Sequence, residues 1–225
     1  MKISKISVQV KNKSRYSVEV DGNYSFSLSA DDLLENKIAR GDDVDSSKIS
    51  ELKTIGSKSL LYDRVINYLS SRPHSRQEIK TYLYKIITKN KDSKEISRDK
   101  KNQIIEEIIE KTESKNYIND LEFAEWFVNQ RLKNSKPKSK NIINSELISK
   151  GIDREIIQTV FERFPNDFDQ NSANLLAEKK LASLEDRYND PKIIKQKLST
   201  YLMGKGFTWE VVSDTIQSLL SKNPI

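Results

Sequence analysis

The first third of the chain alternates apolar and polar residues, which is the period of strands that bury one face. The alternation covers residues 3–10, 16–20 and 24–28, and Asp21-Gly22 separates the last two runs. Asp-Gly between alternating runs is typical of a tight hairpin turn. The pattern therefore predicts three short antiparallel strands.

Helical periodicity follows. Two short helices are expected, one from Ser29 or Ala30 to residue 35 and one at residues 47–54. From about residue 60 onward adjacent apolar pairs recur at steps of three to four residues, as at 104–105 and 108–109. Such pairs lay an apolar stripe along one side of a helix. The pattern predicts nine further helices, over residues 59–71, 75–88, 97–112, 120–133, 139–150, 153–164, 168–186, 191–204 and 208–221.

A proline-containing block occurs three times along the helical part. The first apolar residue of each block is Ile79, Ile143 and Leu198, at intervals of 64 and 55 residues. A period in this range indicates one supersecondary unit that is copied along the chain. Repeats of this kind bury their apolar faces partly on each other and offer a long surface to partners, which favours a binding protein over a catalyst.

The ends of the predicted helices carry capping residues. Ser75 with Glu78 fits a capping box, and Asn119 suits the start of a later helix. The second and third blocks end in Lys-Gly pairs whose glycines, Gly151 and Gly206, suit the left-handed residue that closes a helix.

Together these patterns predict a mainly α protein, an elongated row of three tandem three-helix repeats after a small antiparallel β segment. The expected parts are a β-strand and short-helix extension at residues 1–57 and repeats at residues 58–114, 115–166 and 167–225.

Composition restricts the chemistry and the class of partner. The 225 residues include no Cys and one His, which excludes disulfides, thiolate metal sites and His-based metal sites. The N-terminus has no signal-like apolar run, and no stretch approaches the roughly 18 apolar residues of a membrane span, so we expect a cytoplasmic protein with no membrane partner. The net charge of +6 favours an anionic partner, either nucleic acid, a nucleoprotein or an acidic protein face, although charge can also serve solubility alone.

Catalytic motifs are missing from the sequence. It contains no phosphate-binding Gly-rich loop, no nucleophile elbow and no HExxH. Asp120 stands where a helix starts and is expected to cap it. Glu106, Glu107 and Glu110 alternate with isoleucines as the polar side of an amphipathic helix, which is a better account than Mg²⁺ binding. We therefore expect no enzyme, no catalytic residue, no metal and no cofactor.

Two stretches of the second block resemble the RecX family of recombination regulators. They are DLEFA at residues 120–124, followed by Phe127 and Arg131, and ELISKGI at residues 146–152. SRPHSRQEI at residues 71–79 resembles the opening of that family's first repeat. The N-terminal strands resemble the extension that longer members carry, and the third repeat resembles the family less closely.

This resemblance implies a fold of tandem three-helix repeats and a specific partner. RecX-like proteins bind the RecA recombinase filament on single-stranded DNA and inhibit its ATPase, strand-exchange and co-protease activities, either by lodging in the filament groove or by blocking filament growth. They thereby regulate homologous recombination, DNA repair and the SOS response. For this chain the resemblance implies contact with the filament, including the DNA within it, and we expect the protein to be a monomer.

Basic residues around the repeat loops are the candidate contacts. The densest run lies at 131–140, where a loop enters a helix and could meet phosphates or acidic groups, an attraction that salt weakens. The equivalent loop of the first repeat carries a similar set, and the alternative for both is a solvated loop. The candidates are Arg72, Arg76, Lys80, Arg131, Lys133, Lys136, Lys138, Lys140, Lys150 and Arg154.

Aromatic residues divide into expected core and undetermined positions. Phe123 and Phe127 share a helix face and are expected in the core. Trp126, Tyr82, Tyr84 and Trp209 could stack on bases or anchor a protein if they are exposed.

Two other functions stay open from the sequence. One is a helical module that binds DNA directly, without a recombinase, because helix-turn-helix units have similar sequences. The other is a magnesium-dependent nuclease, which would require carboxylates to converge on one site.

Overall fold

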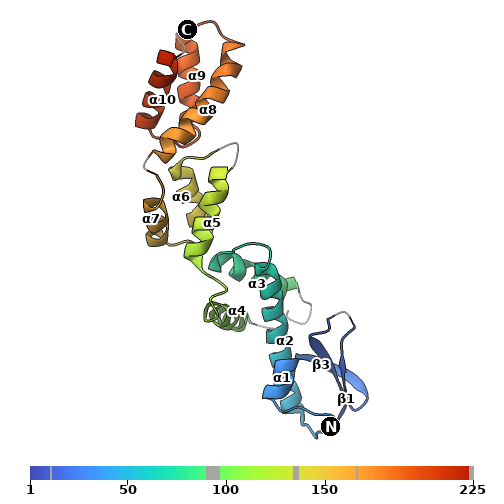
Figure 1. Ribbon diagram of the computed structural model, residues 1–225. Helices are drawn as coiled ribbons and strands as arrows, with labels where there is room; N and C mark the ends of the chain where they lie inside the picture. The colour runs from blue at the N-terminus through green and yellow to red at the C-terminus, as the bar shows by residue number, and fades with distance from the viewer. Residues whose placement is uncertain (11, 90–96, 134–136, 166, 223–225) are drawn as a thin grey trace. The chain divides into compact units, whose positions relative to one another are not determined.

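The computed structural model describes residues 1–10, 12–89, 97–133, 137–165 and 167–222. These residues form ten helices and a small antiparallel sheet, so the expected mainly α fold with an N-terminal β segment is confirmed (Figure 1). The chain divides into two compact units, residues 1–72 with 79–118 and residues 73–78 with 119–225.

The first unit opens with three antiparallel strands in the order β1-β2-β3. They are β1 (Ile3–Val8), β2 (Arg15–Val20) and β3 (Asn23–Ser29), which confirms the alternation pattern. The turn between β2 and β3 consists of Asp21 and Gly22, with φ of 49° and 83°. A two-residue hairpin of type I′ requires positive φ at both positions, which is why Asp-Gly suits it.

Two helices pack on this sheet. The short α1 (Ala30–Glu35) is closed at its start by a capping box between Ser29 and Asp32, and α2 (Ser46–Leu69) follows it. Residues from the sheet and α2 form a common apolar core, which includes Ile3, Val18, Phe26, Leu28, Ile49 and Leu52.

The expectation of two separate helices at residues 47–54 and 59–71 is wrong, because α2 is continuous over both. Gly56, in the expected gap, lies where α2 meets the sheet. A Cβ at this position would lie 2.0 Å from the carbonyl oxygen of Ser27. The glycine therefore permits close packing and does not end the helix. The expected domain boundary between residues 57 and 58 falls inside α2, and the division of the chain into four parts stays a prediction.

The buried Arg15 also joins the sheet to α2. Its side chain is 1% exposed and donates to the carbonyl oxygen of Gly56 at 2.7 Å and to that of Ser27 at 3.1 Å. The guanidinium also pairs with Asp63 at 3.1 Å. Nothing in the sequence analysis singled out Arg15, because its partners are brought together only by the packing of α2 on the sheet.

The rest of the first unit is helical. The second half of α2 packs with α3 (Arg76–Lys89), from Ile79 onward, and with α4 (Arg98–Glu113). Their core includes Val65, Ile79, Leu83, Ile87, Ile105, Ile108 and Ile109. Ile105, Ile108 and Ile109 of α4 are buried as expected and Ile104 is partly buried, while Glu106 and Glu107 pair with lysines at the edge of this helix.

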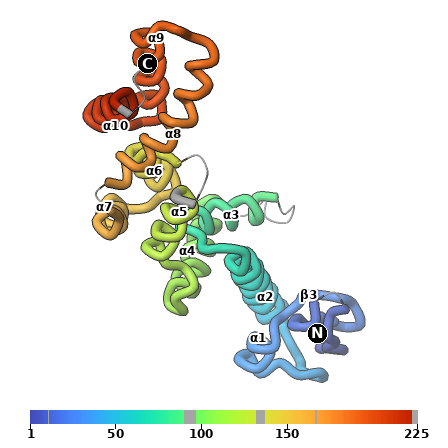
Figure 2. Tube along the Cα trace, turned by 45° about the horizontal axis from the view of Figure 1, so that its top comes forward, coloured from blue at the N-terminus to red at the C-terminus, as the bar shows by residue number. Residues whose placement is uncertain are grey.

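Two three-helix groups make up most of the second unit (Figures 1 and 2). The first contains α5 (Asp120–Lys133), α6 (Lys140–Ser149) and α7 (Arg154–Glu162), and the second contains α8 (Phe168–Glu185), α9 (Pro191–Met203) and α10 (Trp209–Lys222). The ends of these six helices agree with the predicted ends to within two residues. Each group has its own apolar core. We call the two groups the second and third repeats.

Ser139, the N-cap of α6, ties the second repeat to the third. Its buried hydroxyl accepts from the backbone N–H of Ile142 at 3.3 Å and donates to the carbonyl oxygen of Lys205 at 2.9 Å. The backbone N–H of Lys140 donates to a carboxylate oxygen of Asp169 at 2.7 Å. Burial raises the pKa of Asp169, in spite of this hydrogen bond and the nearby Lys140 charge.

Residues 73–78 contact the second repeat in the same way as Ser139 and Lys140 contact the third. The hydroxyl of Ser75 accepts from the backbone N–H of Glu78 at 3.1 Å and donates to the carbonyl oxygen of Lys150 at 2.8 Å. The backbone N–H of Arg76 donates to Asp120 at 2.8 Å. Asp120 therefore caps a helix as expected, but the helix is α3 and not its own α5, which Asn119 caps.

These matching contacts align the repeats residue by residue. Ser75 corresponds to Ser139, Asp120 to Asp169 and Lys150 to Lys205, at intervals of 64, 49 and 55 residues. The glycines after the two lysines, Gly151 and Gly206, have φ of 78° and 79°, which confirms the expected left-handed helix ends.

The third repeat starts its middle helix differently. At the N-terminus of α9, the carboxylate of Asp190 accepts from the backbone N–H of Lys192 at 2.8 Å, and Pro191 occupies the first helical position. Proline suits that position because its fixed φ is helical and the missing N–H would have no partner within the helix.

Candidate partner-binding surface

Arg131 and Lys138 share one carboxylate of this chain. The Nε of Arg131 lies 2.9 Å from an Oε of Glu146, and the ammonium of Lys138 pairs with the other oxygen. Partial burial of Glu146 favours its neutral form, but hydrogen bonds from Lys138 and Arg131 outweigh it and hold the pKa of Glu146 below its ordinary value. The guanidinium of Arg131 also lies 4.5 Å from the ring centroid of Phe127, so this side chain both packs on an aromatic ring and pairs with a carboxylate.

Two more of the predicted contact residues are paired. In the second unit the ammonium of Lys150 lies 2.6 Å from a carboxylate oxygen of Glu78. In the first unit Lys80 pairs with Glu106, also at 2.6 Å. A cation that already has a carboxylate partner adds less to the attraction of a further anion, because the pair is nearly neutral at a distance.

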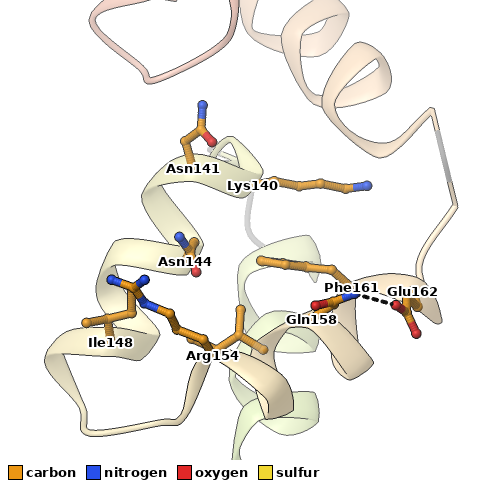
Figure 3. Close-up of a pocket in the computed structure, with 9 residues that line it drawn as sticks. Lys140, Asn141, Asn144, Ile148, Arg154, Gln158, Phe161 and Glu162 are labelled. Carbon is orange, nitrogen blue, oxygen red and sulfur yellow. Dashed lines mark hydrogen bonds between the residues drawn. The ribbon is translucent and has the colours of Figure 1, made fainter.

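Lys140 and Arg154, by contrast, face one groove of about 650 Å³ between α6 and α7. Arg154 stands at the start of α7 and is exposed, and Lys140 stands at the start of α6 with its ammonium 6.0 Å from the ring centroid of Phe168. Figure 3 shows the two cations toward opposite ends of the groove.

Amide and apolar side chains line the groove between these cations. Asn141 and Asn144 come from α6, and Gln158 from α7 donates to Glu162 at 3.0 Å (Figure 3). Ile148, 44% exposed, and the partly buried Phe161 supply apolar surface. Glu162 is an acid that also lines the groove. Two separated cations, with amides and apolar surface around this one acid, suit a polypeptide segment that carries both acidic and apolar side chains.

The remaining predicted contacts are less defined by the structure. The side chains of Arg72 and Arg76 are partly buried. Lys133 lies in α5, but its side chain is outside the described residues, as is the whole of Lys136.

The burial of the aromatic residues agrees with the expected core and shows which of the undetermined rings are exposed. Phe123 and Phe127 are buried, which confirms their place in the core. Tyr82 stacks on Tyr68 with ring centroids 4.1 Å apart, so an internal contact occupies its ring. Of the other undetermined aromatic residues, Trp126 is partly buried, whereas Tyr84, at 43%, and Trp209, at 65%, are exposed.

Neither a metal centre nor a membrane span emerges from the described residues. Across the described ranges, no three acidic or histidine side chains come close enough together to hold a metal ion. Within the same ranges, each helix is too short or too polar to cross a membrane.

Comparison with known proteins identifies the family. Family models match at residues 1–45 (regulatory protein RecX N-terminal domain), 119–160 (RecX, second three-helix domain) and 167–216 (RecX, third three-helix domain). Regulatory protein RecX of Listeria monocytogenes serotype 4b is 34% identical over 211 residues, which cover 94% of this chain and 73% of that protein. This chain belongs to the RecX family. Its similarity to regulatory protein RecX of Bacillus pumilus is 30% identity over 215 residues, with 96% and 76% of the two chains covered.

Solved RecX structures share the fold. The crystal structure of a regulatory protein RecX superposes with a TM-score of 0.72 at 25% identity and covers 94% of this chain and 97% of its own. RecX from Lactobacillus salivarius superposes with a TM-score of 0.58 at 28% identity, over 72% and 96% of the two chains. The resemblance seen in the motifs is therefore confirmed, and it extends to the N-terminal strands and to the third repeat.

RecX membership fits a regulatory role, and the structure adds residues that the sequence analysis missed. Glu78 and Glu146 form ion pairs with three of the predicted contact cations, but the sequence did not indicate either of them as an ion-pair partner. Glu78 is 72 residues from Lys150, so only the docking of residues 73–78 on the second repeat brings them together. Comparing the charges at aligned repeat positions would have indicated both acids.

Proposed function

We propose that this RecX family protein binds the RecA nucleoprotein filament and inhibits its ATPase, strand-exchange and co-protease activities. It would thereby regulate homologous recombination and the SOS response in the cytoplasm, as a monomer and without a catalytic step. The observation that supports the proposal most directly is family membership together with tandem repeats that dock through the same contacts.

Repetition gives the proposal its mechanism. Repeats that dock through equivalent residues present equivalent surfaces at regular intervals, and a recombinase filament presents equivalent protomers at regular intervals. Several weak contacts made by one chain then act together, because each later contact is intramolecular. A chain bound to neighbouring protomers would oppose the rearrangement between them that ATP turnover requires.

The α6/α7 groove is the part of the second repeat that best suits the recombinase. Arg154 is exposed, and no carboxylate among the described residues lies within ion-pair distance of Arg154 or Lys140. Arg131, Lys138 and Glu146 instead form an internal network, in which the end of α5 and the loop before α6 are both held against Glu146 in the second half of α6. We therefore assign partner binding to the groove and a positioning role to the network.

Filament ATPase on single-stranded DNA tests the proposal. Wild-type protein, titrated into preformed filaments, should lower the rate of ATP hydrolysis. The double variant Lys140→Ser, Arg154→Ser should have a half-inhibitory concentration about tenfold higher, because two desolvated charge contacts with the filament are lost. The matched control is Lys13→Ser with Lys85→Ser, which removes the same charge from exposed positions of the first unit. Unchanged ATPase at excess wild-type protein would refute the proposed function, and equal potency of both double variants would remove the groove from the interface.

A further inference from the structure

The third repeat carries lysines whose aligned counterparts in the second repeat are neutralised. Lys180 aligns with Arg131 at the interval of 49 residues that relates Asp169 to Asp120. Arg131 pairs with Glu146, but the position that aligns with Glu146, 55 residues later, is Tyr201. The ammonium of Lys180 lies 5.5 Å from the ring centroid of Tyr201.

A second acid is replaced in the same way. Lys205 aligns with Lys150, whose partner is Glu78, and the position that aligns with Glu78 is Ile142. Ile142 packs beside Gly206 and offers no charge. The ammonium of Lys205 instead lies 5.5 Å from the centroid of the same Tyr201 ring. Two substitutions, from acid to tyrosine and from acid to isoleucine, thus leave both lysines without the carboxylates that their counterparts have.

Lys180 and Tyr201 line a groove of about 760 Å³ along α8 and α9. Lys180, Arg187 and Lys197 line it together with Tyr188 and Tyr201, and the ammonium of Lys197 lies 4.8 Å from the ring centroid of Tyr188. Among the described residues that line the groove there is no Asp or Glu, and within the described chain no carboxylate forms an ion pair with Lys180, Lys197 or Lys205. The groove is therefore a concentrated positive region with two partly exposed aromatic rings.

We propose that this α8/α9 groove binds single-stranded DNA. Lysine and arginine side chains neutralise phosphates, and tyrosine rings stack on unpaired bases of any sequence, which together are the requirements of a single-strand site. An acidic protein segment would use the cations but would not need two rings beside three ammonium groups. The inference goes beyond filament inhibition, because the site would act on DNA without a recombinase.

Fluorescence anisotropy of a labelled oligo(dT), without recombinase, tests the site in the full chain. Each phosphate contact on a single strand contributes about 0.7 to the slope of log affinity against log salt, so Lys180→Ser with Lys197→Ser should lower the slope by about 1.4. The matched control, Lys192→Ser with Lys195→Ser, removes equal charge from exposed positions of α9 outside the groove and should leave the slope nearly unchanged.

A second variant tests the effect of placing an acid at position 201, where the second repeat has Glu146. Tyr201→Glu restores the residue that the second repeat has at this position, where a glutamate is accommodated beside a cation. It should weaken oligo(dT) binding about tenfold or more, since it removes a stacking ring and adds a negative charge beside Lys180. Tyr201→Phe keeps the ring and should bind like the wild type, and equal melting temperatures of all variants would show that folding is intact.

Three results would overturn the site. One is no oligo(dT) binding by the wild-type protein at about 50 mM salt, where such binding is strongest. Another is an equal loss of affinity in the groove variant and its matched control. The third is undiminished oligo(dT) binding by groove variants that no longer inhibit filament ATPase, which would assign the groove to a protein partner. Because DNA binding and ATPase are measured separately, failure of this site and failure of the proposed function are distinguishable.

Discussion

Replacing Ser139 by Ala should destabilise the second and third repeats together. The Ser139 hydroxyl is buried and has two partners, the backbone N–H of Ile142 in its own repeat and the carbonyl oxygen of Lys205 in the next. Loss of an N-cap hydroxyl costs about 1 kcal/mol. Loss of the second hydrogen bond leaves the carbonyl oxygen of Lys205 without this donor and costs about 1 kcal/mol more. We therefore expect a loss of about 2 kcal/mol in the free energy of unfolding.

Urea denaturation measures this loss. Helix content can be followed by circular dichroism, and the second repeat by the emission of the partly buried Trp126 in a Trp209→Phe background. The control is Ser145→Ala, because Ser145 is exposed on the same helix and its hydroxyl donates to the carbonyl of Asn141 in the preceding turn of its own helix. Its effect should stay within about 0.5 kcal/mol. A Ser139→Ala loss no larger than that of the control would refute the view that this hydroxyl joins the repeats.

Other parts of the structure give three further predictions. Arg15→Met should cost about 3 kcal/mol in chemical denaturation of the first unit, because the buried guanidinium holds the Gly56 and Ser27 carbonyls; wild-type stability would contradict this role. Gly206→Ala should lower the melting temperature more than Gly41→Ala. Both glycines have positive φ, but a Cβ at Gly206 would lie 2.7 Å from the Ser139 hydroxyl, whereas a Cβ at Gly41 would have no atom within 4 Å. Equal shifts in melting temperature would show that the side chains around Gly206 move aside at no cost. The pKa of Glu146 is lower in the folded protein than in the unfolded chain, so its stabilisation is present above the unfolded pKa and is lost as pH falls through the folded pKa. The stability difference between wild type and Glu146→Gln should therefore shrink on acidification, and a difference independent of pH would contradict the ion-pair network.

Local patterns predicted the elements of this fold well because they depend on neighbours in sequence. Alternation identified the strands, and the apolar pairs identified the six helices of the second and third repeats. The continuous α2 was missed because the role of Gly56 depends on Ser27 of the sheet, a contact that no local pattern carries.

The candidate surface was less predictable, for the same physical reason. Sequence shows where cations are dense, but not which of them have carboxylate partners. Lys150 and Glu78 are far apart in the chain, and Lys138, in the loop before α6, shares Glu146 with Arg131 of α5. Comparison of aligned repeats gives the useful signal. Tyr201 and Ile142 become informative when they are compared with Glu146 and Glu78, the residues at the equivalent positions of the preceding repeats.

The start of α9 has a consequence for how the repeat array can grow. Each docking contact requires a free backbone N–H at the first residue of a middle helix, which Arg76 and Lys140 supply. Pro191 occupies that position in α9 and has no N–H to give. An additional module therefore could not be appended through the same hydrogen bond, and engineered extension of the array would first require replacing this imino acid.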